Sequence, residues 1–323
     1  MDSTTLPAPV TISTFDTMSE ESRRFASKSR AHRTVEGYRS DWSRFELWCQ
    51  GRNLRSLPAD PATIADYLTS ATSGAQARKA GTIGRWLSAI SSAHKAAGQP
   101  DPTKDPAVQL VWQGIRRTIG TAQVGKSPVL VDQLRRMVAP LSNAPLDLRD
   151  RALLLLGFAG MLRRSEIVAL DVADLTESEE GIKVTIRRSK TDQEGQGQTI
   201  GIPRGLHPET CPVLAVRRWL KLATITDGPV FRKVRRGGHV QMARITPQVV
   251  ALVVKYRAEA VGLEPVTLAG HSLRAGLATS AARAGVADRS IQRQGRWTSP
   301  AMVGRYVREA ELFRENAAAA VGL

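Results

Sequence analysis

The sequence predicts a mainly α-helical protein of two domains, with one small antiparallel β-sheet in the second domain. Apolar residues recur at three- and four-residue steps along most of the chain, which is typical of amphipathic helices. Only residues 182–188 and 199–203 alternate apolar and polar side chains as strands do. The stretch 118–129 contains Gly, Ser and Pro but no helical stripe, so we expect it to link the two domains.

Four helical stripes predict an all-helical N-terminal domain at residues 21–117. The stripes lie at 34–48, 61–68, 83–90 and 107–115. Pro61 can open the second helix and Gly98 can close the third, since proline fits a first helical turn and glycine a helix end. Residues 1–20 lack the basic and apolar regions of a secretory signal, and we expect a flexible tail there.

The second domain is predicted at residues 130–323 and is mainly helical. Residues 131–138 and the run RALLLLGFAG at 151–160 suggest buried helices. The strand at 182–188 is expected to pair with the strand at 199–203, and the Gly-rich stretch SKTDQEGQGQ connects them. Further helices follow as far as the Ala-rich C-terminus.

The charge of the chain points to nucleic acid as its partner. The formal net charge is +16 and the pI is near 10.7. Up to Lys126 the chain has 17 Lys and Arg against 11 Asp and Glu, and the remainder has 29 against 19, so both halves are basic. Clustered Lys and Arg bind nucleic acid by displacing the counterions of its phosphates. An anionic membrane surface is the weaker rival, because no strongly basic helix has a wholly apolar opposite face.

Membrane spans, disulfides and metal sites are not predicted. No apolar run approaches the length that crosses a bilayer. Cys49 and Cys211 lie far apart and without a metal or redox spacing. We therefore expect both thiols to be reduced and buried, in a cytoplasmic protein.

One stretch, GTAQVGKS at 120–127, matches the pattern of a phosphate-binding P-loop. A P-loop needs a buried strand before it and a helix after it. The residues before this stretch carry Arg116 and Arg117 and are typical of a helix, and Pro128 disfavours a helix directly after it. We interpret the stretch as part of the linker, in which Lys126 can still contact a DNA phosphate.

Several polar residues near the C-terminus are placed where they can meet. His271 and Arg274 lie three apart at the start of an Ala-rich helix, so both can project from one face. Trp297 falls in a turn, after which Pro300 fits the first position of a further helix. Tyr306 lies nearly two turns inside that helix.

A second group of polar residues comes earlier in the chain. Arg163, Arg164 and Glu166 are expected at the end of the apolar helix at 151–160, where Glu166 can orient an arginine that needs an anion. Lys190 lies at the tip of the predicted hairpin, from which it could swing toward a substrate. Taken singly, most of these side chains are more often structural than functional.

The order of these residues resembles the active site of the tyrosine recombinase (phage integrase) family: Arg163-x-x-Glu166, Lys190, His271-x-x-Arg274, Trp297 and Tyr306. Most members have a second histidine where this chain has Trp297, whereas Cre-like members have tryptophan there. The runs GHSLRAGLATSAARAGV and GRWTSPAMVGRYVRE are also Cre-like. The resemblance implies a core-binding domain at 21–117 and a catalytic domain at 130–323, which together clamp duplex DNA.

The resemblance also implies the reaction. Tyr306 would be the nucleophile that cleaves a DNA phosphodiester, giving a 3′-phosphotyrosine and a free 5′-hydroxyl without ATP, metal or another cofactor. Lys190 would be the general acid for the leaving oxygen. His271 would assist proton transfer at Tyr306 or bind the phosphate.

The remaining residues would hold the phosphate. Arg163 and Arg274 would bind its non-bridging oxygens, Trp297 would donate its indole N–H, and Glu166 would support the arginines without reacting. The implied partner is double-stranded DNA with a recognition site of inverted repeats, bound by a homotetramer on two sites. The C-terminal residues after Tyr306 would dock on a neighbouring subunit, and a bacterial, phage or plasmid origin would follow.

Three alternatives stay open beside a site-specific recombinase. A type IB topoisomerase would use the same nucleophile to relax DNA. A regulator would bind DNA without catalysis, and Tyr306→Phe would then have no activity to remove. A P-loop ATPase would depend on Lys126. Arg164 and Arg305 are assigned no chemistry.

Overall fold

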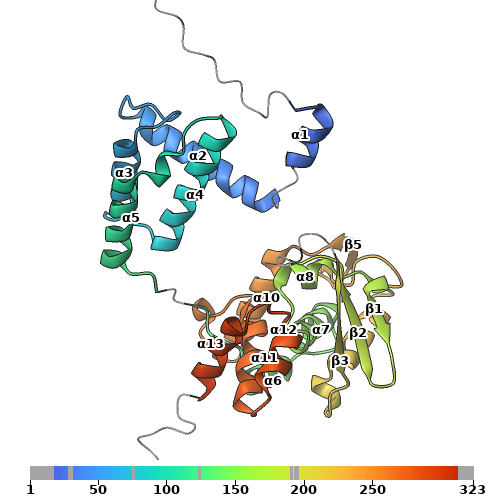
Figure 1. Ribbon diagram of the computed structural model, residues 1–323. Coiled ribbons are helices and arrows are strands. Elements are labelled where there is room, and N and C mark those ends of the chain that lie inside the picture. The colour runs from blue at the N-terminus through green and yellow to red at the C-terminus, as the bar shows by residue number, and fades with distance from the viewer. Residues whose placement is uncertain are drawn as a thin grey trace, which may run out of the picture. The chain divides into compact units, whose positions relative to one another are not determined.

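The computed structural model describes residues 18–27, 32–74, 77–122, 125–189, 192 and 196–311 (Figure 1). Its chain divides into two compact units, Met1–Val124 and Gly125–Leu323. Each unit has its own hydrophobic core. The expected N-terminal tail up to residue 17, Lys190 and the C-terminal segment from residue 312 lie outside the described residues.

The first unit consists of helices. Its elements are α1 (Glu20–Ser27), α2 (His32–Gln50), α3 (Pro61–Ser70), α4 (Ala80–Ala96), η1 (Pro102–Lys104) and α5 (Pro106–Ile119). Helix α2 packs against α4, and α3 packs against α5 (Figure 1). Asp60 and Asp105 cap α3 and α5 by accepting backbone N–H groups, and a proline follows each cap. The four predicted helices are confirmed as α2 to α5.

Helix α1 was not predicted. It begins at Glu20, at the end of the stretch for which the sequence predicts a tail. Helix α1 contains one large apolar residue, Phe25, which is 64% exposed. A single apolar residue forms no periodic pattern, so the sequence does not indicate this helix.

Aromatic side chains fill the core of the first unit, as the sequence predicts. Phe45, Tyr67 and Trp86 are buried, and the rings of Tyr67 and Trp86 stack with centroids 5.1 Å apart. Trp48 meets Tyr67 edge-on at 5.2 Å. Burial raises the pKa of Tyr67 above its usual value, because the phenolate would lose its water. These rings are packing residues and not base-stacking platforms.

The second unit carries the remaining elements. They are α6 (Val131–Val138), α7 (Pro145–Ala159), α8 (Arg164–Ala169), η2 (Val172–Asp174), β1 (Leu175–Glu177), β2 (Gly181–Ile186), β3 (Gln198–Pro203), η3 (Pro208–Thr210), α9 (Pro212–Leu222), β4 (Arg232–Val234), β5 (Val240–Arg244), α10 (Pro247–Glu259), η4 (Pro265–Thr267), α11 (Ser272–Arg283), α12 (Asp288–Gly295) and α13 (Pro300–Glu311). Helix α7 is almost entirely buried and packs against both α9 and α11. The apolar run at 151–160 is therefore the centre of the core.

The predicted hairpin is present within a three-stranded sheet. Strands β1, β2 and β3 are antiparallel neighbours in that order (Figure 1). Ile182 pairs with Ile202 and Val184 pairs with Ile200, so all four apolar side chains face the core. This alternation is the period of two that the sequence shows.

A second hairpin corrects the prediction of helices alone after residue 203. Strands β4 and β5 pair antiparallel, with Arg232 opposite Arg244. Charged residues interrupt the alternation of these strands, so their sequence has no clear strand pattern. The connection contains Gly237 and Gly238 with φ of 84° and 83°, a conformation that favours glycine.

The predicted continuation of the apolar helix to Arg163 is wrong. Helix α7 ends at Ala159, and Met161 takes a φ of 46°, which turns the chain. The N–H of Leu162 donates to the carbonyl of Gly157 at 3.0 Å, closing this turn. Arg163 is then the N-cap of α8. The arginine thus begins a new helix instead of ending the old one.

The predicted linker at 118–129 is structured at both ends. Helix α5 continues to Ile119. The N–H of Ser127 donates to the carbonyl of Thr267 and that of Val129 to the carbonyl of Ser272, both at 2.9 Å. The P-loop alternative does not fit the structure. Helix α5 precedes the stretch where a P-loop needs a strand, and the Lys126 ammonium donates to the carbonyl of Val266 at 2.6 Å.

Both cysteines are free and buried, as predicted. Within the described residues, no helix is both long and apolar enough to span a bilayer. The described part of the chain likewise has no group of three or more His, Cys, Asp or Glu side chains that could hold a metal ion.

Helix α11 approaches the segment around Val129 so closely that only glycine fits at residue 276. A Cβ on Gly276 would lie 1.9 Å from the Val129 carbonyl oxygen. Gly276→Ala should therefore lower the free energy of unfolding by about 3 kcal/mol, measured by urea denaturation. Gly201→Ala is the control, since a Cβ at Gly201 meets nothing within 4 Å. Equal stability of the two variants would contradict this packing.

Candidate active site

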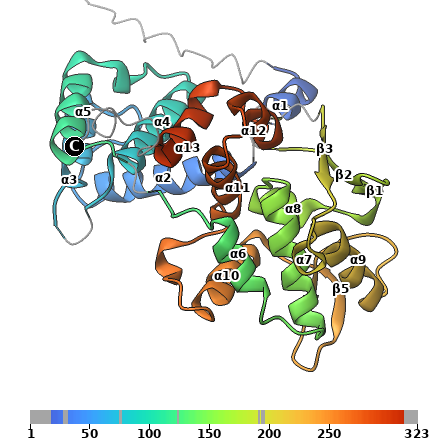
Figure 2. The same ribbon diagram turned by 90° about the horizontal axis from the view of Figure 1, so that it is seen from below.

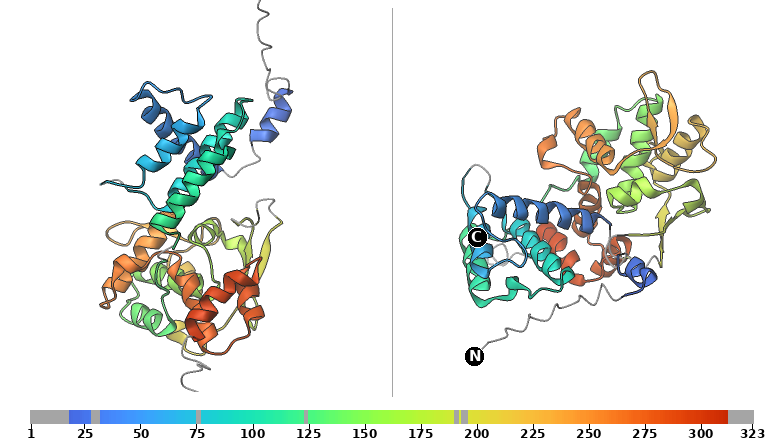
Figure 3. Two further views of the ribbon diagram at one scale, coloured as in Figure 1. Left: turned by 60° about the vertical axis from the view of Figure 1, so that its left-hand side comes forward. Right: turned by 90° about the horizontal axis from the view of Figure 1, so that it is seen from above.

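Three segments of the second unit bring the predicted site residues together. Arg163 and Glu166 lie at the start of α8, and His271 and Arg274 lie at the start of α11. Tyr306 lies on α13, which begins at Pro300 as predicted. Helix α11 packs against both α12 and α13 (Figures 2 and 3). The described residues of the predicted set therefore share one site.

Glu166 is the buried anion of this site. Its side chain is 1% exposed and accepts two hydrogen bonds from Arg163, one from Nη1 at 2.7 Å and one from the backbone N–H at 2.9 Å. It also accepts a hydrogen bond from Nη2 of Arg296 at 2.7 Å. The carboxylate thus joins two arginines, a geometry in which Glu166 can orient Arg163.

Arg274 lies directly beside this group and is fully buried. Its Nη1 donates to the carbonyl of Met161 at 2.6 Å, and its Nη2 donates to the carbonyl of Gly295. Its guanidinium carbon lies 4.6 Å from the centroid of the Trp297 ring. Burial, followed by the charges of Arg163 and Arg296, lowers the pKa of Arg274 to about 9.

The three arginines exceed the carboxylates near them. Among the described residues, Arg163, Arg274 and Arg296 carry three positive charges and Glu166 supplies one negative charge, which leaves a net charge of +2. Arginines that lower one another's pKa gain stability when an anion arrives. Planar guanidinium groups match the oxygens of a phosphate better than lysine does. The cluster can therefore bind a phosphate diester.

Tyr306 faces this cluster through His271 and Trp297. The His271 Nε2 and the Tyr306 Oη are 3.3 Å apart. The Trp297 and Tyr306 rings stack with centroids 5.3 Å apart and an interplanar angle of 25°. Loss of water around the ring, followed by the positive charges of Arg274 and other arginines, lowers the pKa of His271 below its usual value. A neutral imidazole can accept the phenol proton.

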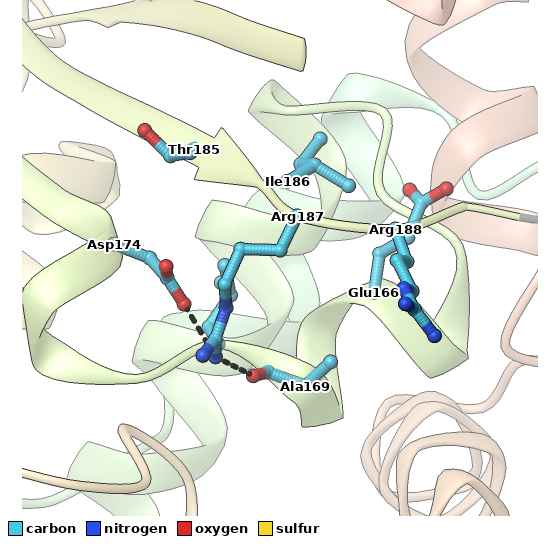
Figure 4. A pocket seen from close by; sticks show the side chains of 8 residues that line it. Glu166, Ala169, Asp174, Thr185, Ile186, Arg187 and Arg188 are labelled. Carbon is cyan, nitrogen blue, oxygen red and sulfur yellow. Dashed lines mark hydrogen bonds and ion pairs between the residues drawn. The ribbon is translucent and has the colours of Figure 1, made fainter. Parts of the chain in front are cut away.

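A cavity of about 500 Å³ lies against Glu166, where α8 meets the end of β2. In Figure 4 the Arg187 side chain points from the end of β2 toward Asp174 and the carbonyl of Ala169. Arg187 binds Asp171 at 2.6 Å and Asp174 at 2.9 Å. These ion pairs hold the end of β2, the strand after which residue 190 follows in the sequence.

Arg296 is the site residue that the sequence did not reveal. Its side chain is 4% exposed and binds Glu166, although it lies in a turn where an arginine is normally solvated. The one sequence signal is its place directly before Trp297, in a turn that follows a helix. Arg164 and Arg305 have no assigned role in the geometry described above.

The chain matches the model of the phage integrase family over residues 129–312. It is 40% identical over 304 residues to an integrase/recombinase XerD homolog of Selenomonas ruminantium, covering 93% of this chain and 88% of that protein. It is 28% identical over 285 residues to the recombinase Cre of Escherichia phage P1, covering 82% of this chain and 80% of that protein.

Solved structures share the fold at low sequence identity. XerH site-specific recombinase bound to palindromic difH substrate matches with a TM-score of 0.61 and 16% identity, over 82% of this chain and 73% of that chain. A lambda integrase dimer bound to a COC′ core site matches with a TM-score of 0.58 and 17% identity, over 89% of this chain and 92% of that chain. The predicted fold class, mainly helical with a small antiparallel sheet, is confirmed, and the hairpin of β4 and β5 adds a second sheet.

Removal of the Glu166 charge should destabilise the second unit strongly. Glu166→Gln keeps the shape of the side chain but leaves the buried Arg296 and the half-buried Arg163 without their carboxylate. We expect the free energy of unfolding to fall by about 3–5 kcal/mol. Glu259→Gln, which removes an exposed carboxylate from α10, is the control. If the free energy of unfolding of Glu166→Gln fell by less than about 1 kcal/mol, the stabilising role of the Glu166 carboxylate would be contradicted.

His271 should make the unit less stable in acid. Its pKa is lowered in the folded state, so the unfolded chain binds the proton first, from about pH 6.5 downward. Stability is then lost as the pH falls below 6.5 toward the folded pKa, and His271 contributes nothing above that window. His271→Gln should lose less stability than the wild type between pH 7 and pH 5 in urea denaturation. Identical losses would contradict the lowered pKa.

Proposed function

Because the chain belongs to the phage integrase family, the tyrosine recombinases, we propose that it is a site-specific recombinase that cleaves and rejoins duplex DNA through a 3′-phosphotyrosine. The observation that carries this proposal is the Tyr306 Oη at 3.3 Å from the His271 Nε2, beside a buried arginine cluster. A nucleophile, its base and a phosphate site are the parts that phosphoryl transfer to a tyrosine requires.

In the proposed reaction the Tyr306 oxygen attacks the phosphorus of a DNA phosphodiester. The new bond joins the tyrosine oxygen to phosphorus, and the bond from phosphorus to the 5′-oxygen breaks. The phenol proton passes to His271, whose lowered pKa keeps the ring neutral near pH 7. The leaving 5′-oxygen takes a proton from Lys190, which stays a prediction of the sequence because it lies outside the described residues.

Arg163 and Arg274 are proposed to bind the two non-bridging oxygens of the phosphate. Arg163 suits this role because Glu166 fixes its guanidinium and its side chain keeps 15% exposure. Arg274 is buried under the ring of Trp297, so the phosphate would exchange with the carbonyl contacts that it now makes. Trp297 would donate its indole N–H to the same phosphate. The phosphotyrosine bond conserves the energy of the cleaved phosphodiester for the rejoining step, so the proposed reaction uses no ATP, metal or other cofactor.

Double-stranded DNA is the proposed partner, gripped by both units as a clamp. The first unit would be the core-binding domain and the second the catalytic domain, since both parts of the chain are basic. Exchange of strands between two recognition sites with inverted repeats would need four copies, so we propose a homotetramer on two sites. We place this reaction in the cytoplasm, where bacterial, phage or plasmid DNA is found.

Tyr306→Phe should abolish covalent DNA capture and leave DNA affinity nearly unchanged, because it removes only the nucleophilic oxygen. Tyr256→Phe is the matched control, since Tyr256 is an exposed tyrosine on α10. The proteins are incubated with fragmented DNA from the source organism and denatured, and the ends of the protein-linked DNA are sequenced. We expect the wild type and Tyr256→Phe to capture fragments with a common end sequence, and we expect Tyr306→Phe to capture none.

Two other results of this experiment would change the proposal. Covalent DNA formed by Tyr306→Phe would remove Tyr306 as the nucleophile. Covalent ends without a shared sequence, together with relaxation of supercoiled plasmid, would indicate a topoisomerase instead of a site-specific recombinase.

Lys126→Ala should leave the yield of covalent DNA unchanged within about twofold, with or without ATP. The ammonium of Lys126 already binds the carbonyl of Val266, and a helix precedes it where a P-loop needs a strand. The yield is measured by the same capture. A requirement for ATP that Lys126→Ala removes would restore the ATPase alternative.

A further inference from the structure

Arg296 has a backbone conformation that usually belongs to glycine. It follows α12 with φ of 54° and ψ of 44°, in the left-handed region. The N–H of Arg296 donates to the carbonyl of Arg293 at 3.1 Å, and the N–H of Trp297 donates to that of Gln292 at 3.2 Å. This pattern ends many helices, and glycine is favoured at its left-handed position because a side chain is strained there. An arginine at this point needs a compensating interaction.

The guanidinium of Arg296 makes that interaction inside the protein. Its Nη2 donates to Oε2 of Glu166 at 2.7 Å and to the carbonyl of Met161 at 3.3 Å. Its Nη1 donates to the carbonyl of Gly160 at 3.1 Å. These acceptors all belong to the turn between α7 and α8 or to α8 itself. Arg296 therefore ties the turn before Trp297 to the start of α8.

Direct contact of Arg296 with a DNA phosphate does not fit this geometry. Its side chain is 4% exposed, and both of its Nη atoms are bound to protein acceptors. Arg163, in contrast, keeps 15% exposure and shares the Glu166 carboxylate with Arg296. The position of Arg296 thus fixes the carboxylate that orients Arg163.

The two neighbours of Arg296 in the chain both contact Arg274. The carbonyl of Gly295 accepts a hydrogen bond from Arg274, and the ring of Trp297 lies 4.6 Å from its guanidinium carbon. A Cβ on Gly295 would lie 2.4 Å from the Trp297 ring, so this turn has little freedom of its own. Fixing Arg296 therefore also sets the contacts of Arg274 and, through Trp297, the stacking on Tyr306.

We propose that Arg296 is a positioning residue for DNA cleavage, which rests on the proposed recombinase function. Its guanidinium holds Glu166 and the turn before Trp297 in register, so that Arg163, Arg274 and Tyr306 converge on one phosphate. The residue does not touch the DNA. Where glycine would leave this turn flexible, the Arg296 side chain fixes it to Gly160 and Glu166.

Three variants test this role. Arg296→Gly removes the guanidinium and suits the left-handed backbone, so the protein should still fold. Arg296→Lys keeps the charge without the planar fork. Arg293→Gln removes an exposed charge from the same helix and is the control. Covalent DNA is captured from fragmented DNA of the source organism, and its yield is divided by the DNA bound before denaturation.

We expect Arg296→Gly to form covalent DNA about 100-fold more slowly per bound fragment, because loss of alignment acts on the chemical step. Its DNA binding should match the wild type, Arg296→Lys should fall between the two, and Arg293→Gln should behave as the wild type. Millimolar guanidinium should restore part of the rate in Arg296→Gly by occupying the vacated site beside Glu166. A rate equal to the wild type, or a loss of DNA binding together with cleavage, would overturn the proposal.

Hydrogen exchange of the backbone amides at 296–299 separates this proposal from the proposed function. Exchange there should be faster in Arg296→Gly than in the wild type and in Arg293→Gln. If the wild type forms no covalent DNA, the recombinase function fails, and exchange alone decides whether Arg296 fixes the turn. Equal exchange in Arg296→Gly and the wild type would overturn the positioning role in either case.

Discussion

The site depends on one buried carboxylate among arginines. Glu166 is 1% exposed, and it binds Arg163 from its own helix and Arg296 from a turn far along the chain. A buried charge is costly unless it is paired and hydrogen-bonded, and this carboxylate is bonded on both oxygens. The same bonds join α8 to the segment before α13. Glu166 therefore links the proposed phosphate-binding side of the site to the tyrosine side.

The carboxylate supports the site but does not neutralise it. Among the described residues, Arg274 donates to two carbonyl oxygens and lies against the Trp297 ring, and burial, followed by the neighbouring arginines, lowers its pKa to about 9. The free protein thus holds positive charge in a place with little water, which makes it ready for an anion. Burial, followed by the charges of Arg274 and Arg163, lowers the pKa of His271 and keeps the ring in the form that accepts a proton. The proposed phosphate binding and the proposed activation of Tyr306 would therefore both follow from one electrostatic arrangement.

The sequence allowed much of this arrangement to be predicted. The helical stripes predicted α2 to α5, and the alternation at 182–203 predicted β2 and β3, because both patterns follow burial on one face. The order of the polar residues predicted that His271, Arg274, Trp297 and Tyr306 meet, and these side chains do contact one another.

Features set by tertiary contacts could not be predicted. The break between α7 and α8 depends on Met161 with φ of 46°; Gly160 caps α7, but the left-handed residue after it is a methionine, which no local pattern indicates. Arg296 likewise takes a left-handed conformation, and its side chain binds Glu166, which lies 130 residues earlier in the chain. Strands β4 and β5 are rich in charged residues and carry no apolar alternation. Local patterns report burial along one element, whereas these features arise between elements.

The most direct test of the account is to locate the bond between protein and DNA. Covalent complexes of the wild type would be digested with protease and nuclease, and the peptide that carries nucleotides would be sequenced by mass spectrometry. The account predicts one modified peptide, with the nucleotide attached through its 3′-phosphate to the oxygen of Tyr306. A nucleotide on another side chain, or a 5′-phosphate linkage, would contradict the mechanism built on Tyr306, His271 and the arginine cluster.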